Sequence, residues 1–336
     1  MTALIGQQAQ ERDFIDAQTG ARGAHAWLLT GPKGIGKAGF ARRAACWLIA
    51  HGEAPANHSE SLDVAAAHPA MPLIEHGAHP EYLWLKRDIA PSKVKKADAD
   101  NPAEEDLARN ITVDQVRALI GRMRNKPAVA ARRAVVIDSI DDLERGAANA
   151  LLKTLEEPPE HTVFFLVSHN PGRLLPTIRS RCRSLRFAPL DNADMQRALA
   201  AARPGLDAPA VVALSKLGEG SPGRALAYAA IDGIDAIDQQ LRAIASSGDR
   251  DNRLRTALAR QFGLAAAKPK FDVMLAQALA LTAEAAHSGG QPGQAALAAR
   301  ARILDIGGPA VRNSEDLATV AFAIGSSLAG LAINRR

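Results

Sequence analysis

The chain has 336 residues, 47% of them hydrophobic, which predicts two or three domains and a sizeable buried core. A formal net charge of +5 permits contact with nucleic acid but does not indicate it, because scattered surface charge gives the same surplus. The two isolated cysteines, Cys46 and Cys182, exclude a disulfide framework and favour a cytoplasmic protein. We expect no signal peptide and no membrane contact, because no apolar run approaches the roughly 18 residues that span a bilayer.

Short apolar runs separated by helical patterns occupy the first part of the chain. Residues 26–30 (AWLLT) predict a buried strand that ends at Gly31, and apolar residues at helical spacing predict a helix over 37–50. Similar apolar runs predict four more strands, over residues 82–86, 134–138, 163–168 and 184–187.

The segments between these strands carry helix signals. Thr112 and Gln115 have the spacing of a capping box, which predicts a helix from Thr112 to about Asn125. Residues 146–157 predict a helix that Pro158 and Pro159 end, and residues 171–182 predict a short helix or turn. This alternation of strands and helices predicts an α/β domain with a mainly parallel sheet.

The strand signals stop after Pro189. Residues 191–232 predict several short helices broken at glycines and prolines, including Pro222 and Gly223, and residues 234–336 predict Ala/Leu-rich helices. We therefore expect an α/β domain over 1–188, a small helical domain over 189–235 and an all-helical domain over 236–336. A polar insert covers about 51–106, and its part from 91 to 106 is expected to be exposed or disordered.

The segment Gly31-x-x-Gly34-x-Gly36-Lys37 lies between the first strand and the first long helix. Glycine N–H groups, a helix N-terminus and a lysine together suit the phosphates of a nucleotide. The next residue is Ala38, where a Mg²⁺-binding loop has a serine or threonine hydroxyl. The motif thus predicts a phosphate cradle without its metal ligand and leaves ATP or ADP binding open. The alternative is a simple turn between a strand and a helix.

A second departure from a hydrolytic site follows the strand over 134–138. Asp138 stands where a carboxylate would hold Mg²⁺ through water, but Ser139 stands where a glutamate would polarise the attacking water. A serine hydroxyl cannot accept that proton as a carboxylate does. Two separate positions lack their chemistry, which indicates a protein that keeps the fold and has lost hydrolysis.

Several longer phrases carry a family resemblance. The chain resembles the clamp-loader subunits of bacterial DNA polymerase III in six stretches: ALLKTLEEPP, RSRC, HAWLLTGPKGIGK, HPEYLWL, ITVDQVRALI and EGSPGRAL. The resemblance implies a RecA-like AAA+ parallel-sheet domain, followed by a small helical lid domain and a C-terminal helical collar. The C-terminal third fits in architecture but carries no sharp motif.

Ala38 and Ser139 set the chain apart from the gamma/tau-type motor subunits, which it otherwise resembles. The resemblance therefore implies a stator subunit with no independent ATPase activity and no required cofactor. Its implied partners are motor subunits of the gamma/tau type and a delta-type clamp-opening subunit, with the sliding clamp and primed DNA reached through the complex. The alternatives are an active gamma/tau-type ATPase and a free-standing nucleic-acid-binding protein.

The same resemblance assigns further site residues. The arginine of the SRC motif, Arg181, matches an arginine finger that acts in trans on a neighbouring subunit's ATP; the alternative is an ion-paired surface arginine. Arg224 matches a second-sensor position. A polar first sensor is expected among Ser168, His169 and Asn170, with Asn170 preferred.

The insert departs from the resemblance because relatives carry four zinc-binding cysteines there. Residues 51–80 contain no cysteine, but they contain five histidines, at positions 51, 58, 68, 76 and 79. Their spacing matches no zinc-site template, so we expect no metal. For Cys182, we expect a packing role because no His/Asp partners are evident.

Overall fold

The computed structural model describes residues 4–19, 23–52, 61–94, 98, 106–263, 268–287, 289–313 and 316–333. Contacts divide the chain into two compact units: Met1–Ala202 with Gly220–Gly223, and Arg203–Glu219 with Arg224–Arg336. The three-domain division stays a prediction. Among the described residues, no helix is both long and apolar enough to cross a membrane.

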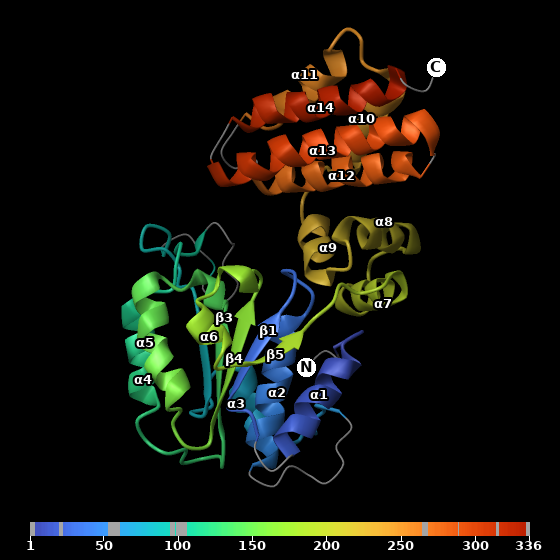
Figure 1. Cartoon of the computed structure of the whole chain (residues 1–336). Coiled ribbons are helices and arrows are strands. Elements are labelled where there is room, and N and C mark those ends of the chain that lie inside the picture. The colour runs from blue at the N-terminus through green and yellow to red at the C-terminus, as the bar shows by residue number, and fades with distance from the viewer. Residues whose placement is uncertain are drawn as a thin grey trace. The chain divides into compact units, whose positions relative to one another are not determined.

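The first unit is built on a five-stranded, all-parallel sheet in the order β2-β3-β4-β1-β5 (Figure 1). Its strands are β1 (Ala26–Thr30), β2 (Tyr82–Lys86), β3 (Arg133–Asp138), β4 (Thr162–Ser168) and β5 (Arg183–Arg186). All five strands were predicted, with bounds that differ by a residue at most. The prediction of an α/β domain with a mainly parallel sheet is therefore confirmed.

Helices cover both faces of this sheet (Figure 1). One face carries α1 (Gln8–Thr19), α2 (Lys37–His51) and α3 (Ala70–Glu75), and the other carries α4 (Val113–Arg122), α5 (Arg145–Glu156) and α6 (Pro176–Arg179). Successive strand residues point to opposite faces, so Trp27 and Leu29 join the first core and Leu28 the second. Burial on both faces explains the near-continuous apolar runs.

Local signals explain where several of these helices begin and end. Thr112 and Gln115 form the predicted capping box at the start of α4. Helix α5 ends at Glu156, two residues before Pro158, as that proline predicts. The segment over 171–182 forms a 3₁₀ turn at Pro171–Arg173 and the short α6.

Helix α7 (Asn192–Ala202) completes the first unit, and the second is entirely helical in its described part. Its helices are α8 (Ala208–Gly218), α10 (Ile234–Ser247), α11 (Arg253–Arg260), α12 (Lys268–Ala286), α13 (Gly290–Asn313) and α14 (Leu317–Ile333). Helix α9 (Pro222–Ala229) starts in one unit and continues in the other. The predicted break at Pro222 falls between α8 and α9, and this proline begins α9 because its missing N–H costs no bond in the first turn. The predicted break at Gly223 was wrong, because Gly223 lies inside α9.

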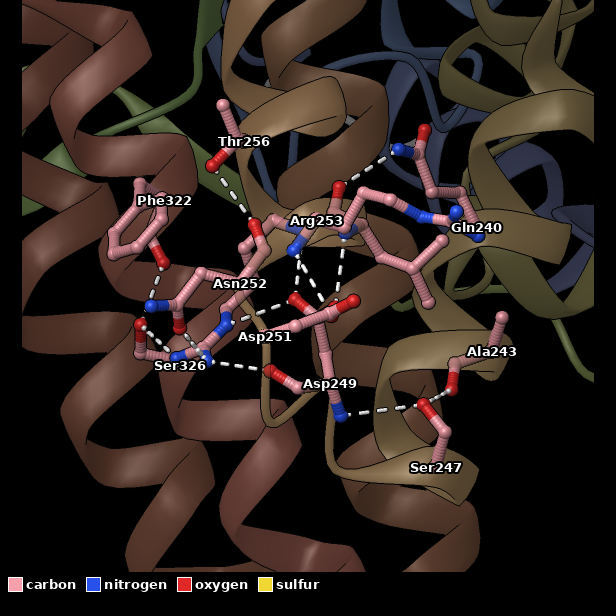
Figure 2. A network of polar contacts seen from close by, with 12 residues as sticks. Gln240, Ala243, Ser247, Asp249, Asp251, Asn252, Arg253, Thr256, Phe322 and Ser326 are labelled. Atoms are coloured by element: carbon pink, nitrogen blue, oxygen red, sulfur yellow. Dashed lines mark hydrogen bonds and ion pairs between the residues drawn. The ribbon is translucent and has the colours of Figure 1, made fainter.

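A polar network ties the turn between α10 and α11 to α14 (Figure 2). The Asp249 carboxylate accepts hydrogen bonds from the N–H groups of Leu254 and Arg255, each at 2.9 Å, and from Arg255 Nε at 3.0 Å. Arg255 also donates to Ser326 Oγ at 3.0 Å and lies over the Phe322 ring. Burial pushes the pKa of Asp249 upward, but these hydrogen bonds outweigh it and hold that pKa below its ordinary value.

An ion pair between Arg133 and Glu81 is buried at the start of β3. Arg133 Nε donates to Glu81 Oε2 at 2.9 Å, and the two side chains are only 4% and 3% exposed. Arg133 Nη1 also reaches the carbonyl of Asn125 at 3.0 Å, while Glu81 Oε1 accepts from the Ala128 N–H at 2.8 Å. The pair thus links β2, β3 and the loop between α4 and β3.

Replacing Arg133 with methionine should destabilise the first unit by about 3–5 kcal/mol, because Glu81 would keep a buried charge without its partner. Urea unfolding followed by tryptophan fluorescence measures this directly, since all three tryptophans, at 27, 47 and 84, lie in the first unit. Lys126→Met, which removes an exposed ion pair to Glu160, is the control and should leave the midpoint unchanged. Equal losses from both variants would contradict this account.

Candidate functional site

The carboxyl ends of β1, β3 and β4 meet at one edge of the sheet. Thr30 pairs with Ser168, and Asp138 pairs with Val167, so three connections leave the sheet side by side. This edge therefore collects the glycine loop after Thr30, the acidic end of β3 and the polar residues that follow β4. Ligands of parallel α/β sheets bind at this kind of edge.

The loop after β1 has the backbone of a phosphate cradle. Gly31, Gly34 and Gly36 have φ values of +144°, +83° and +102°, which side chains rarely adopt. A Cβ on Gly31 would also lie 2.4 Å from the Phe187 carbonyl oxygen. Helix α2 starts directly afterwards, and its first N–H groups have no partner within the helix. The loop can therefore receive an anion.

Lys37 is turned onto its own loop. Its side chain is buried, and Nζ donates to the carbonyl oxygens of Gly31 at 2.6 Å and Pro32 at 2.5 Å. Burial lowers the pKa of Lys37 to about 8, against the opposing pull of Asp138 and Asp141. The ammonium therefore closes the loop, and a bound phosphate would have to share it with these carbonyls.

The metal and water positions of this edge lack their chemistry. Ala38 offers only a methyl group directly after Lys37, and Ser139, which follows Asp138 in the sequence, is buried. Burial, assisted by Asp142, raises the pKa of Asp138, while Lys37 opposes that shift. Across the described ranges, no three His, Cys, Asp or Glu side chains gather as metal ligands do. The residues fit a phosphate group better than a Mg²⁺ ion.

Asp141, which sequence reasoning did not single out, organises the end of β4. Its carboxylate accepts hydrogen bonds from Ser168 Oγ at 2.9 Å and from the N–H groups of His169 at 2.5 Å and Asn170 at 3.3 Å. All three residues proposed as sensors are thus fixed by one carboxylate. The acidic residues that follow β3 in the sequence, Asp141 and Asp142, could have indicated this role. The preference for Asn170, which is exposed, stays a prediction.

His169 is the most perturbed histidine at this edge. Burial and the nearby Lys37 ammonium lower the pKa of His169 to about 4, although Asp141 acts in the opposite direction. Its Nδ1 atom is buried and has no hydrogen-bond partner within the described part of the chain. The imidazole is therefore neutral at physiological pH and faces the site as an uncharged group.

This shift predicts a pH dependence of stability. Unfolded histidine takes up its proton near pH 6.5 and folded His169 only near pH 4, so the first unit should lose stability as pH falls from about 6.5 to 4. His169→Gln should flatten part of that slope in urea unfolding followed by tryptophan fluorescence. Exposed His76→Gln should keep the wild-type slope, and an unchanged slope in both variants would contradict the assignment.

A second unexpected contact reaches the loop from Ser221 and from the first turn of α9. Ser221 Oγ donates to the Lys33 carbonyl at 2.8 Å, and the Gly223 N–H donates to the Gly34 carbonyl at 2.9 Å. A Cβ on Gly223 would lie only 2.9 Å from Gly34 Cα. The two glycines therefore allow a close backbone approach that fixes the outer side of the loop.

Gly223→Ala should destabilise the first unit by roughly 1–3 kcal/mol, because the added methyl group displaces the loop backbone. The matched control is Gly121→Ala in α4, where nothing lies within 4 Å and alanine should stabilise by about 0.5–1 kcal/mol. Tryptophan fluorescence during urea unfolding reports both changes. A stabilising effect at Gly223 would refute the close approach.

Each of the two predicted arginines forms an ion pair with a glutamate. Arg181 donates to Glu156 Oε1 at 2.5 Å and to the Thr177 carbonyl at 2.7 Å, both outside the loop. Arg224 belongs to the second unit, where it pairs with Glu219 at 2.9 Å. Their predicted roles toward a nucleotide, in trans and as a second sensor, stay predictions.

Within the described part of the insert, no three His, Cys, Asp or Glu side chains gather as metal ligands do, and the expectation of no zinc stays a prediction. Nδ1 of His51 and of His76 contacts a backbone carbonyl oxygen, whereas Nδ1 of His68 and of His79 accepts from a backbone N–H. The fifth histidine, His58, lies outside the described residues. Cys182 packs at the edge of the second core, as predicted, and burial raises the pKa of its thiol to about 12, which disfavours the thiolate form.

The family follows from a match to a model described as "DNA polymerase III, delta subunit", which covers residues 6–191. The chain belongs to this family. It is 37% identical over 203 residues to DNA polymerase III subunit delta' of Pseudomonas aeruginosa, covering 60% of this chain and 55% of that protein. The corresponding protein of Escherichia coli is 31% identical over 234 residues, covering 70% and 63%.

The chain is also similar to tau/gamma subunits of DNA polymerase III. DNA polymerase III subunit tau/gamma of Haemophilus influenzae is 31% identical over 223 residues, which cover 65% of this chain and 28% of that protein. The chain thus matches a little over half of the length of its delta' relatives and a smaller part of this tau/gamma relative. The predicted likeness to clamp-loader subunits of DNA polymerase III is confirmed.

Proposed function

We propose that this chain is a stator subunit of the delta-prime type in a clamp loader of DNA polymerase III. In this role it assembles with gamma/tau-type motor subunits and a delta-type clamp-opening subunit. The complex places a sliding clamp on primed DNA, and this chain gives rigidity and an arginine, not hydrolysis. Its own nucleotide site keeps the cradle and lacks the catalytic groups.

The observation that supports this proposal most strongly is which residues stand at the carboxyl edge of the sheet. Ala38 and Ser139 remove a metal ligand and a general base at two positions that are independent in sequence. Lys37 is occupied by the carbonyl oxygens of Gly31 and Pro32. These features disfavour the alternative of an active gamma/tau-type ATPase, in spite of the similarity to tau/gamma proteins.

The cradle still supports ATP or ADP binding as a structural ligand. The glycine backbone and the start of α2 form a site for phosphate, and no catalytic step is needed for a bound nucleotide to stabilise the unit. We do not assign a required cofactor, because Lys37 already holds the loop closed through its own carbonyls.

Arg181 is the residue through which the chain would act on a neighbour. It stands between α6 and β5 with its side chain 31% exposed, so a neighbouring subunit can reach the guanidinium. An arginine that contacts a γ-phosphate in trans stabilises the charge of the transition state. A subunit with an inactive site of its own can therefore still control hydrolysis next to it.

Arg181→Ala should slow hydrolysis at the one motor site that faces this chain by at least about 10³, the usual contribution of an arginine finger. In the complex reconstituted with motor and clamp-opening subunits, clamp and primed DNA, a single-turnover experiment should show one fewer ATP hydrolysed per complex. Arg179→Ala, also exposed and two residues away, is the matched control and should leave the count unchanged. Full hydrolysis with Arg181→Ala in an intact complex would contradict the proposal.

A further inference from the structure

Glu156 at the end of α5 holds Arg181 at a defined place on the surface. Glu156 Oε1 accepts from Arg181 Nη2 at 2.5 Å, and the Thr177 carbonyl accepts from Nη1 at 2.7 Å. The hydroxyl of Ser180 lies 3.4 Å from the same Nη1. The guanidinium is therefore fixed by two groups on different elements, 25 and 4 residues away in sequence.

The other two arginines of the RSRCR segment are placed differently. Arg183 lies over the Trp27 ring, 5.2 Å from its centre, and so contributes to packing. Arg179 is exposed, and no ion pair to it occurs among the described residues. Arg181 alone of the three combines partial exposure with a carboxylate that sets its direction, in the part of the chain that the structure describes.

The exposure of the pair decides what kind of role it has. Glu156 is 47% exposed and Arg181 is 31% exposed, and ion pairs in such positions add little to folding stability. A contact that contributes little to stability can still restrict a long side chain to one geometry. Arginine has five N–H donors in a planar fork, so donors remain for a phosphate after Glu156 and Thr177 each take one.

We infer that Glu156 is a positioning residue for Arg181: it aims the guanidinium at the γ-phosphate of the neighbouring motor subunit. This inference rests on the proposed function of Arg181. The carboxylate makes no contact with the nucleotide and acts only through the arginine. Fixing the finger before the neighbour docks avoids the loss of side-chain freedom during catalysis.

Glu156→Ala should lower kcat at the facing motor site by about tenfold, since small displacements of a catalytic group cost one to two powers of ten. KM for ATP should stay unchanged, because binding belongs to the motor subunit. Glu156→Gln keeps a hydrogen-bond acceptor of the same size and should recover most of the rate. Glu157→Ala, an exposed carboxylate next in the chain, is the matched control and should behave as wild type.

The double variant separates this inference from the proposed function. In the Arg181→Ala background, Glu156→Ala should have no additional effect, because a positioning residue has nothing left to position. If Arg181→Ala slows the facing site but Glu156→Ala leaves or raises its kcat, the inference is wrong and the proposed function stands. If Arg181→Ala itself has no effect, the proposed function fails and the inference fails with it.

Discussion

The buried Lys37 ammonium donates to two carbonyl oxygens of the loop that precedes it, and this contact determines how the first unit is closed at its functional edge. The chain turns tightly here between β1 and α2, where three glycines adopt backbone conformations that side chains rarely allow. In an active nucleotide site this lysine would serve the phosphates. Here Lys37 also stabilises the loop, because its hydrogen-bond acceptors are carbonyl oxygens of the loop itself.

Other groups at the edge are arranged around this closed loop. Asp141 fixes the end of β4 from one side, and Ser221 and Gly223 fix Lys33 and Gly34 from the other. Burial lowers the pKa of Lys37 to about 8 and that of His169 to about 4, so at neutral pH the lysine keeps most of its charge and the histidine is uncharged. The result is a glycine-rich edge with the backbone geometry for a phosphate group, but with a methyl group after Lys37 and a hydroxyl, not a carboxylate, after Asp138.

Most of the first unit could be predicted because its strands are short, apolar and bounded by clear turns. The capping box of Thr112 and Gln115 and the proline stop after α5 are local signals, and they were predicted correctly. The departures at Ala38 and Ser139 are also local signals, since each is one residue type at one motif position.

The contacts that the sequence did not predict are those between distant segments. Asp141 meets residues 27 to 29 positions away, Ser221 meets a residue 188 positions away, and Glu156 meets Arg181 across 25 positions. Nothing in the spacing of these residues signals their pairing, because the topology of the sheet brings them together. Gly223 was misinterpreted for a related reason: it lies inside α9, and its close approach to Gly34 has no signal in the local sequence.

The central claim is that this chain keeps the nucleotide fold and does not hydrolyse ATP by itself. The most direct test is a single-turnover measurement in which the chain alone, in excess over radiolabelled ATP with Mg²⁺, is followed for ADP formation beside a gamma/tau-type motor subunit. The account predicts that ATP stays intact with this chain, even if nucleotide is bound. ADP formed at the rate of the motor subunit would show that Ala38 and Ser139 do not abolish catalysis and would contradict the account.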